Sequence, residues 1–93
     1  MIEKIVKIVT KDGIHMRPAM YIVDEAVKYE CDIKIYNKDK EADAKSIMQV
    51  TMLAMIYDEE VRIVANGKDE VEAIKSLEEL IVNDFSNLTN ANN

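Results

Sequence analysis

A single histidine, His15, is the residue of this sequence best suited to nucleophilic chemistry. It lies between Gly13, which allows a sharp turn, and Pro18, which suits the first turn of a helix because proline lacks a backbone donor. We therefore expect His15 at or beside a helix start, where free N–H groups and the helix dipole favour an anion. The same field disfavours a protonated ring and leaves a lone pair for attack on phosphorus.

Arg17 follows two residues after His15 and supplies a second group with phosphate chemistry. Its planar guanidinium can donate paired hydrogen bonds to the oxygens of a phosphoryl group. The alternative interpretation is that His15 is an ordinary polar loop residue, and spacing alone does not exclude this. An independent hydrolase is not predicted, because no serine or cysteine nucleophile and no carboxylate pair accompany the histidine.

Ser46 is a second candidate, because it precedes the apolar run 47–56 and is followed three residues later by Gln49. This spacing is typical of a capping box at the start of a helix. The plain interpretation is a helix cap, worth about 1 kcal/mol for a serine. The other is a regulatory phosphorylation site, since phosphate at a helix start is stabilised by the dipole and adds about two negative charges.

The chain has six methionines in 93 residues, which is a high number. Methionine often fills cores, but the second predicted helix already has an inward-facing stripe of other apolar residues: Ile47, Val50, Leu53 and Ala54. Methionines of that helix, among them Met55, share a different face. We expect an exposed and adaptable docking patch for several partners, made of Met16, Met20, Ile47, Met48 and Met52.

Apolar periodicity along the chain alternates between the periods of strands and helices. Strands are predicted at 2–9, 32–36, 40–44 and 61–65, and helices at 16–29, over 47–56, and from Asp69 to about Asp84. In the last helix Asp69 and Glu72 suggest a cap, and we expect these residues to face inward: Val71, Ile74, Leu77, Leu80 and Ile81. The order βαββαβα predicts an α+β open-faced sandwich, a four-stranded antiparallel sheet covered on one face by three helices.

The composition and the distribution of charge argue against further classes of function. The net charge is −6, and all of the excess negative charge falls after residue 46. Without a basic stripe or an aromatic platform, nucleic-acid binding is not predicted. We expect one domain over 1–85, a disordered polar tail over 86–93, no membrane insertion, no secretory signal and a cytoplasmic monomer. The lone Cys31 predicts neither a disulfide nor a metal site but a small apolar filler, and no cofactor is expected.

Two segments resemble the HPr family, the histidine-containing phosphocarriers of the phosphoenolpyruvate:sugar phosphotransferase system. The segment 13–19, Gly-Ile-His-Met-Arg-Pro-Ala, resembles the active-centre signature, and the segment 45–48, Lys-Ser-Ile-Met, resembles the regulatory serine segment. The resemblance covers residues 1–85. It implies that His15 accepts phosphate on Nδ1 from phosphorylated enzyme I and passes it to the A domains of sugar-specific permeases, while Arg17 stabilises the phosphoryl group.

For Ser46 the resemblance implies phosphorylation by an HPr kinase/phosphorylase and a role with a regulator of carbon catabolite repression. Residues matching Ile47 and Met48 form a docking surface in the family. The sequence departs from the family pattern at Met16, usually a small residue, at Thr51, usually apolar, and where glycines are common: Gln49, Ala54 and 56–58. With few glycines, we expect a second helix that is longer than usual.

Two other functions compete with a phosphocarrier. The first is a regulatory HPr-like binding protein that acts through Ser46 and the methionine-rich patch, but such paralogues lack the active histidine that this chain retains as His15. The second is an acyl carrier, which is also small and acidic with a modified serine at a helix start. No aspartate directly precedes Ser46, and the predicted strands contradict an all-helical fold.

Overall fold

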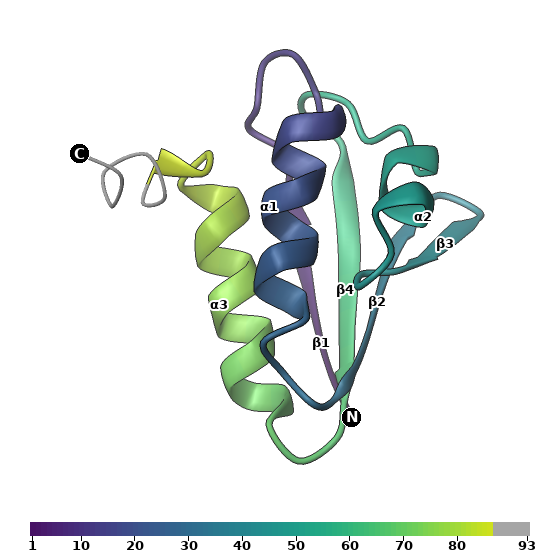
Figure 1. The fold of residues 1–93 in the computed structure, drawn as a ribbon. Helices are drawn as coiled ribbons and strands as arrows, with labels where there is room; N and C mark the ends of the chain where they lie inside the picture. Colours follow the sequence, from purple (N-terminus) through teal and green to yellow (C-terminus); the bar gives the residue numbers. More distant parts are fainter. Residues whose placement is uncertain (87–93) are drawn as a thin grey trace.

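The computed structural model describes residues 1–86, which form one antiparallel sheet with three helices on one of its faces (Figure 1). The strands are β1 (Ile2–Lys7), β2 (Asp32–Asn37), β3 (Lys40–Asp43) and β4 (Glu60–Asn66), and the helices are α1 (Met16–Ala26), α2 (Ile47–Met52) and α3 (Glu70–Val82). Spatially the strands run β1-β4-β2-β3. The α+β open-faced sandwich in the order βαββαβα is therefore confirmed.

The alternation of side chains along each strand decides which residues reach the helices. On β2 the isoleucines Ile33 and Ile35 are buried, and on β4 Val61 and Ile63 are buried, with more exposed residues between them. The register pairs Ile35 with Ile63 in neighbouring strands, so β-branched side chains pack side by side. The buried Leu77 of α3 completes this core from the helical side. Cys31 is buried in the same core, which confirms its place as an apolar filler.

The opposite face of the sheet carries no helix and is covered by charged side chains. Arg62 lies over the ring of Tyr36, 4.4 Å from its centroid, and its Nη1 is 3.1 Å from Oε1 of Glu3 on the neighbouring strand. Lys34 and Glu41 make another cross-strand pair at 3.1 Å. These pairs place compensating charges and the stems of long side chains over the sheet, so this face tolerates water without a covering layer.

Apart from the second helix, three elements end two or three residues before their predicted ends. The first strand ends at Lys7 rather than at residue 9, and α1 ends at Ala26 rather than at residue 29. After Ala26 the amides of Lys28 and Tyr29 bond to carbonyls three residues back, which tightens the last turn and leaves Val27 exposed. Helix α3 ends at Val82, two residues before the predicted end.

The second helix is much shorter than the predicted run 47–56, and the expectation of an unusually long helix is wrong. It ends at Met52, and Ala54 follows in the left-handed region with φ of 51°. This reversal buries both Leu53 and Met55, whereas a continued helix would rotate one of them away from the core. A residue with a Cβ in this conformation costs about 1–2 kcal/mol, so burial outweighs local preference here.

Asp69 precedes α3 but does not cap it, which corrects the predicted capping pattern. Its carboxylate instead accepts hydrogen bonds from the backbone N–H groups of Glu30 at 2.9 Å and Cys31 at 3.0 Å, in the loop between α1 and β2. The bond from Glu30, ahead of that from Cys31, lowers the pKa of Asp69 below its ordinary value. Val71 is exposed rather than inward, and the inward face of α3 begins at Ala73.

The first prediction concerns this carboxylate. Because its pKa is lower in the folded chain, Asp69 stabilises the fold above an ordinary aspartate pKa of about 3.9, and the contribution is lost as pH falls through the folded pKa. Asp69→Asn should lower the melting temperature at pH 7, because an amide N–H₂ would face a backbone donor. The difference from wild type should shrink between pH 5 and pH 3.

Melting curves followed by circular dichroism across that pH range provide the measurement. Asp32→Asn, a change at an exposed position on the open face of the sheet, is the control. A difference between Asp69→Asn and wild type that stays constant with pH would contradict the prediction.

Candidate functional site

His15 is the N-cap residue of α1, with extended backbone angles φ −85° and ψ −163°. Its carbonyl accepts the N–H of Ala19 at 3.0 Å, while its side chain is exposed and makes no capping hydrogen bond. The predicted position at the helix start is therefore the observed one. The imidazole ring is therefore free to contact another molecule. A serine or aspartate side chain that bonded to the backbone at the same cap would not be free.

The loop before His15 is held against a second loop, residues 53–59. Gly13 has φ of +78°, its N–H donates to the Thr10 carbonyl at 3.0 Å, and a Cβ on it would lie 2.9 Å from the Met55 carbonyl oxygen. Only glycine accommodates both the angle and this close approach. The next residue, Ile14, is buried, and its N–H donates to the same Met55 carbonyl at 2.9 Å. The chain is thus fixed one residue before the histidine.

The first turn of α1 separates an inward side from an outward side. Pro18 and Ala19 are buried, while Met16 and Arg17 are exposed next to His15. The N–H groups of a first helical turn have no partner within the helix and carry the positive end of the dipole. This end of α1 therefore offers an anion both backbone donors and a guanidinium, with no cover from the rest of the described chain.

Ser46 is the N-cap residue of α2, and its Oγ accepts the N–H of Gln49 at 3.3 Å. The reciprocal half of the predicted capping box is absent, because Oε1 of Gln49 accepts the N–H of Asp43 at 2.8 Å instead. Gln49 thereby provides an acceptor for an outward-facing backbone N–H of the edge strand β3. Beside Ser46, the ammonium of Lys45 donates to the Tyr29 carbonyl at 2.7 Å and links this helix start to the segment after α1.

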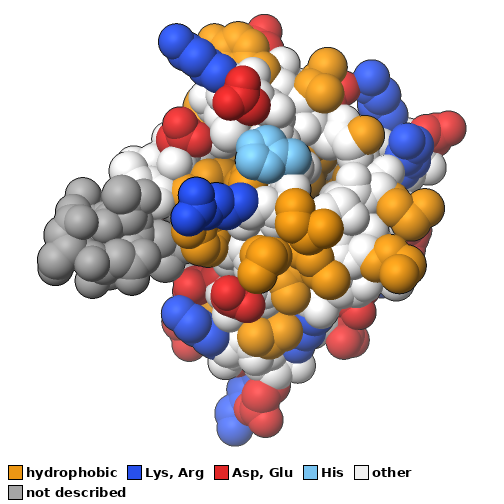
Figure 2. Space-filling view, turned by 45° about the horizontal axis from the view of Figure 1, so that its top comes forward, with side chains coloured by type: hydrophobic (Ala, Val, Ile, Leu, Met, Phe, Trp, Pro, Cys, Tyr) orange, Lys and Arg blue, Asp and Glu red, His pale blue; other side chains and the backbone are white. Residues whose placement is uncertain are grey.

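Four of the five residues of the predicted docking patch have exposed side chains. Met48 and Met52 of α2 are 69% and 68% exposed, Met16 and Met20 of α1 are also exposed, and Ile47 is half-buried. Figure 2 shows hydrophobic side chains gathered beside the single histidine. Met55, which was expected on the same helix face as Met48 and Met52, is only 2% exposed because the helix has ended before it.

Two exposed apolar residues were missed by sequence reasoning. Ile56 and Tyr57 lie in the loop 53–59 and are more than half exposed. They follow the residue whose carbonyl binds Ile14, so they belong to the loop that supports His15. The sequence did contain a signal for these two residues, because they occupy positions where glycines are common in the family. Replacing those glycines also puts apolar side chains on the surface.

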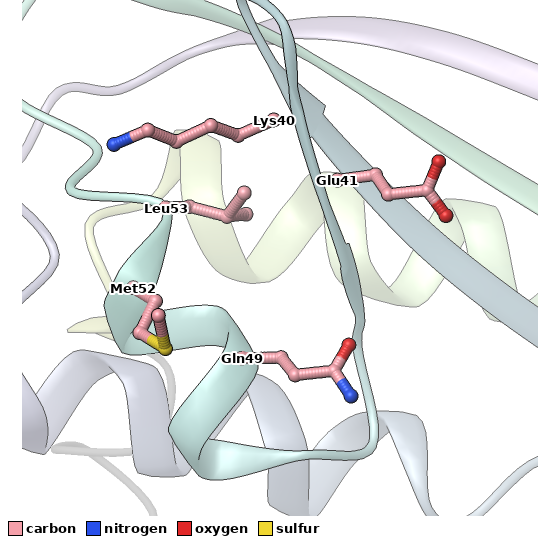
Figure 3. A pocket seen from close by; sticks show the side chains of 5 residues that line it. All are labelled: Lys40, Glu41, Gln49, Met52 and Leu53. Atoms are coloured by element: carbon pink, nitrogen blue, oxygen red, sulfur yellow. The ribbon is translucent and has the colours of Figure 1, made fainter.

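A groove of about 420 Å³ lies between β3 and α2. Figure 3 shows the side chains that line it, from both elements and from the residue after α2: Lys40, Glu41, Gln49, Met52 and Leu53. His15 is not among them. Within residues 1–86 no cluster of histidine, cysteine and carboxylate side chains could hold a metal ion, and no helix is long and apolar enough to cross a membrane.

The family model for the PTS HPr component phosphorylation site matches residues 2–83. The chain belongs to the HPr family. The phosphocarrier protein HPr of Haloferax volcanii is 37% identical over 81 residues, which cover 85% of this chain and 91% of that protein. HPr-C-His from Thermoanaerobacter tengcongensis has a crystal structure with a TM-score of 0.89 and 38% identity, covering 92% of this chain and 97% of the other.

HPr proteins are phosphocarriers of the phosphotransferase system, and the family assignment made from two motifs is thus confirmed. The similar structures also include Crh, the catabolite repression HPr of Bacillus subtilis, at 34% identity and a TM-score of 0.72, covering 89% of this chain and 95% of the other. That crystal structure is described as an intertwined dimer with a swapped domain. The expected monomer therefore stays a prediction.

Proposed function

We propose that this HPr protein accepts a phosphoryl group on His15 from phosphorylated enzyme I and passes it to the A domains of sugar-specific permeases. The observation that supports this most is the exposed imidazole at the start of α1, which makes no capping bond and directly follows the anchored residue Ile14. In each transfer the ring nitrogen forms its bond to phosphorus as the donor's bond breaks, and the reverse occurs toward the acceptor. The protein is a carrier and turns over no substrate of its own.

Two further groups stabilise the transferred group in this proposal. The guanidinium of Arg17 can donate to phosphoryl oxygens, and the free N–H groups of the first turn of α1 can do the same from the backbone. The helix holds the backbone N–H groups in position before the phosphoryl group arrives, so they need little reorganisation during the transfer. Because Arg17 is exposed, it can also accompany the phosphoryl group toward either partner.

The second prediction tests the acceptor. Incubation with phosphoenolpyruvate and purified enzyme I should raise the intact mass of the wild type by one phosphoryl group and leave His15→Ala unchanged, since the substitution removes the nucleophile from an exposed position without touching the core. Arg17→Ala is the matched control and should still be labelled, about 10-fold more slowly, because the helix start remains. Acid-labile label on His15→Ala would exclude this assignment.

The docking patch is proposed to bind enzyme I and the permease A domains in turn. It borders His15, it is uncharged, and its thioether side chains can repack against differently shaped partners (Figure 2). An interface core of this kind excludes water around the transfer, which strengthens the hydrogen bonds to the phosphoryl group. The exposed side chains of Met48 and Met52 lower the solubility of the free chain, as is expected for an apolar binding surface.

The third prediction separates docking from stability. Met48→Glu should weaken enzyme I binding by about 10-fold or more, because a carboxylate would be desolvated in an apolar interface, while the free energy of unfolding changes by less than about 0.5 kcal/mol. Calorimetric binding and urea denaturation give the two numbers. Val71→Glu, at an exposed apolar position on α3 outside the patch, should leave both unchanged. Large destabilisation with intact affinity would place Met48 in the core.

Ser46 is proposed as a regulatory site, the target of an HPr kinase/phosphorylase whose product binds a regulator of carbon catabolite repression. The support is its position at the start of α2, directly before Ile47 and Met48 of the docking patch. A phosphate there would place about two negative charges beside an apolar interface. The same phosphate can therefore repel one partner and be recognised by another.

The fourth prediction concerns this serine. Aspartate caps helices as well as serine does, so Ser46→Asp should keep the melting temperature near that of wild type. If the site is regulatory, His15 should nevertheless be phosphorylated about 10-fold more slowly, a difference of about 1.4 kcal/mol in activation free energy. Initial rates at matched ionic strength provide the measurement, with Asn66→Asp on the open face as the charge control. Equal initial rates for wild type, Ser46→Asp and Asn66→Asp would indicate that Ser46 acts only as a helix cap.

The second candidate function is a regulatory binding protein that acts mainly through Ser46 and the docking patch. The presence of Crh among the similar structures supports considering it. The discriminating observation is His15 itself, which an exclusively regulatory protein does not need. A wild type that binds enzyme I but takes no label from phosphoenolpyruvate would favour this alternative over the phosphocarrier.

A further inference from the structure

We propose that Asn37 and Glu59 are positioning residues for His15, which they hold in place through the loop 53–59 without touching it. The inference rests on the proposed phosphocarrier function for its kinetic consequence, but its structural part stands on hydrogen bonds alone. It assigns a role to a buried amide at the end of β2 and to a carboxylate directly before β4.

Asn37 is the one buried polar residue of the described chain, with 4% of its surface exposed. It ends β2, and its Nδ2 donates both hydrogens, to the Leu53 carbonyl at 3.0 Å and to Oε1 of Glu59 at 3.2 Å. A buried amide costs free energy unless its hydrogen bonds are satisfied, so this side chain specifies where both acceptors must lie. Asn37 therefore fixes the beginning of the loop and, through Glu59, its end.

Glu59 closes the loop from within. Its Oε1 also accepts the N–H of Ile56 at 2.9 Å, and its Oε2 pairs with the ammonium of Lys38 at 2.9 Å. The bond from Lys38, followed by that from Ile56, lowers the pKa of Glu59 and keeps it ionised. Only 14% of this side chain is exposed, so the carboxylate acts as a central acceptor for three donors from two parts of the chain, the adjacent Asn37 and Lys38 and the loop residue Ile56.

Met55 links the Asn37–Glu59 pair to the segment directly before the histidine. It lies between Leu53 and Ile56, both held by the Asn37–Glu59 pair, and its carbonyl is the acceptor for the N–H of Ile14. The loop needs such a constraint, because Ala54 and Asp58 adopt left-handed conformations, φ 51° and 75°, that residues with a Cβ rarely adopt. Without Glu59 the loop can relax, and Ile14 loses the partner that fixes the histidine.

The consequence for transfer follows from geometry. Phosphoryl transfer needs the ring nitrogen in line with the breaking bond, and a displacement of about 1 Å can cost about 100-fold in rate. Partial loosening of one hydrogen-bonded residue before His15 should have a smaller effect, about 10-fold. Affinity for enzyme I should change little, because the docking patch lies on α1 and α2 and none of its five residues bonds to Glu59.

The experiment compares Glu59→Ala, Glu59→Gln and Glu41→Ala. Glutamine keeps an oxygen that can accept from Asn37 and Ile56, so it should rescue most of the effect. Glu41 makes an exposed pair with Lys34 on the open face, so Glu41→Ala removes a comparable ion pair without reaching the loop. All measurements are made at a temperature where circular dichroism shows each variant to be folded.

Two readouts are taken on each variant. Amide hydrogen exchange of Ile14 reports the bond to Met55 directly, with the amide of Ile63 in the central strand as an internal reference for global unfolding. Steady-state phosphorylation by enzyme I gives kcat and KM. In Glu59→Ala we expect Ile14 to exchange about 10-fold faster relative to Ile63 and kcat to fall about 10-fold at nearly unchanged KM, with Glu59→Gln and Glu41→Ala close to wild type.

The outcomes are distinguishable. Unchanged exchange of Ile14 in Glu59→Ala would overturn the proposed anchor, whatever the kinetics show. Faster exchange with unchanged kcat would overturn the positioning role, and equal losses in Glu59→Ala and Glu41→Ala would reduce the effect to general destabilisation and overturn it too. A wild type that takes no phosphoryl group would overturn the proposed function, while the exchange measurement would still decide whether Glu59 anchors Ile14.

Discussion

The hydrogen bond from the Ile14 amide to the Met55 carbonyl joins the two loops on which the candidate site depends. One of these loops leads into α1, and the other leads out of α2, so this bond links the start of α1 to the end of α2. It forms only because Gly13 leaves no Cβ against that carbonyl. The sheet beneath supplies the rigid base, since Ile8 bonds to both Asp58 and Glu59 directly after β1.

The loop 53–59 shows how burial can override local preference. Ala54 and Asp58 take left-handed conformations in which glycine would be easier, and α2 ends early as a result. Leu53 and Met55 are both buried in return, each worth about 1.5–3 kcal/mol of hydrophobic stabilisation, more than the local backbone cost. Met48 and Met52 lie within the shortened helix and remain on the surface.

The strands, their order and the two helix starts could be predicted because their signals are local. Alternation along 32–36 and 61–65 and the turn residues around Gly13 and Ser46 each act within a few positions. The ends of α1 and α2 could not, since Tyr29 packs against the core after α1 and Ala54 turns so that Leu53 and Met55 are both buried. Nor could the role of Asp69, whose spacing predicts a helix cap but whose carboxylate bonds to Glu30 and Cys31, far away along the chain.

In the proposed function, the separation between the exposed imidazole and its backbone anchor would let one fold serve both a phosphoryl donor and a phosphoryl acceptor. The imidazole of His15 is exposed and does not cap α1, so adding or removing a phosphoryl group changes no bond in the core. The backbone before the ring is held instead by Ile14, which is buried and bonded to Met55. In the proposed function, phosphorylation of His15 would therefore leave the fold unchanged, and the direction of transfer would depend on the relative phosphoryl affinities of the partners.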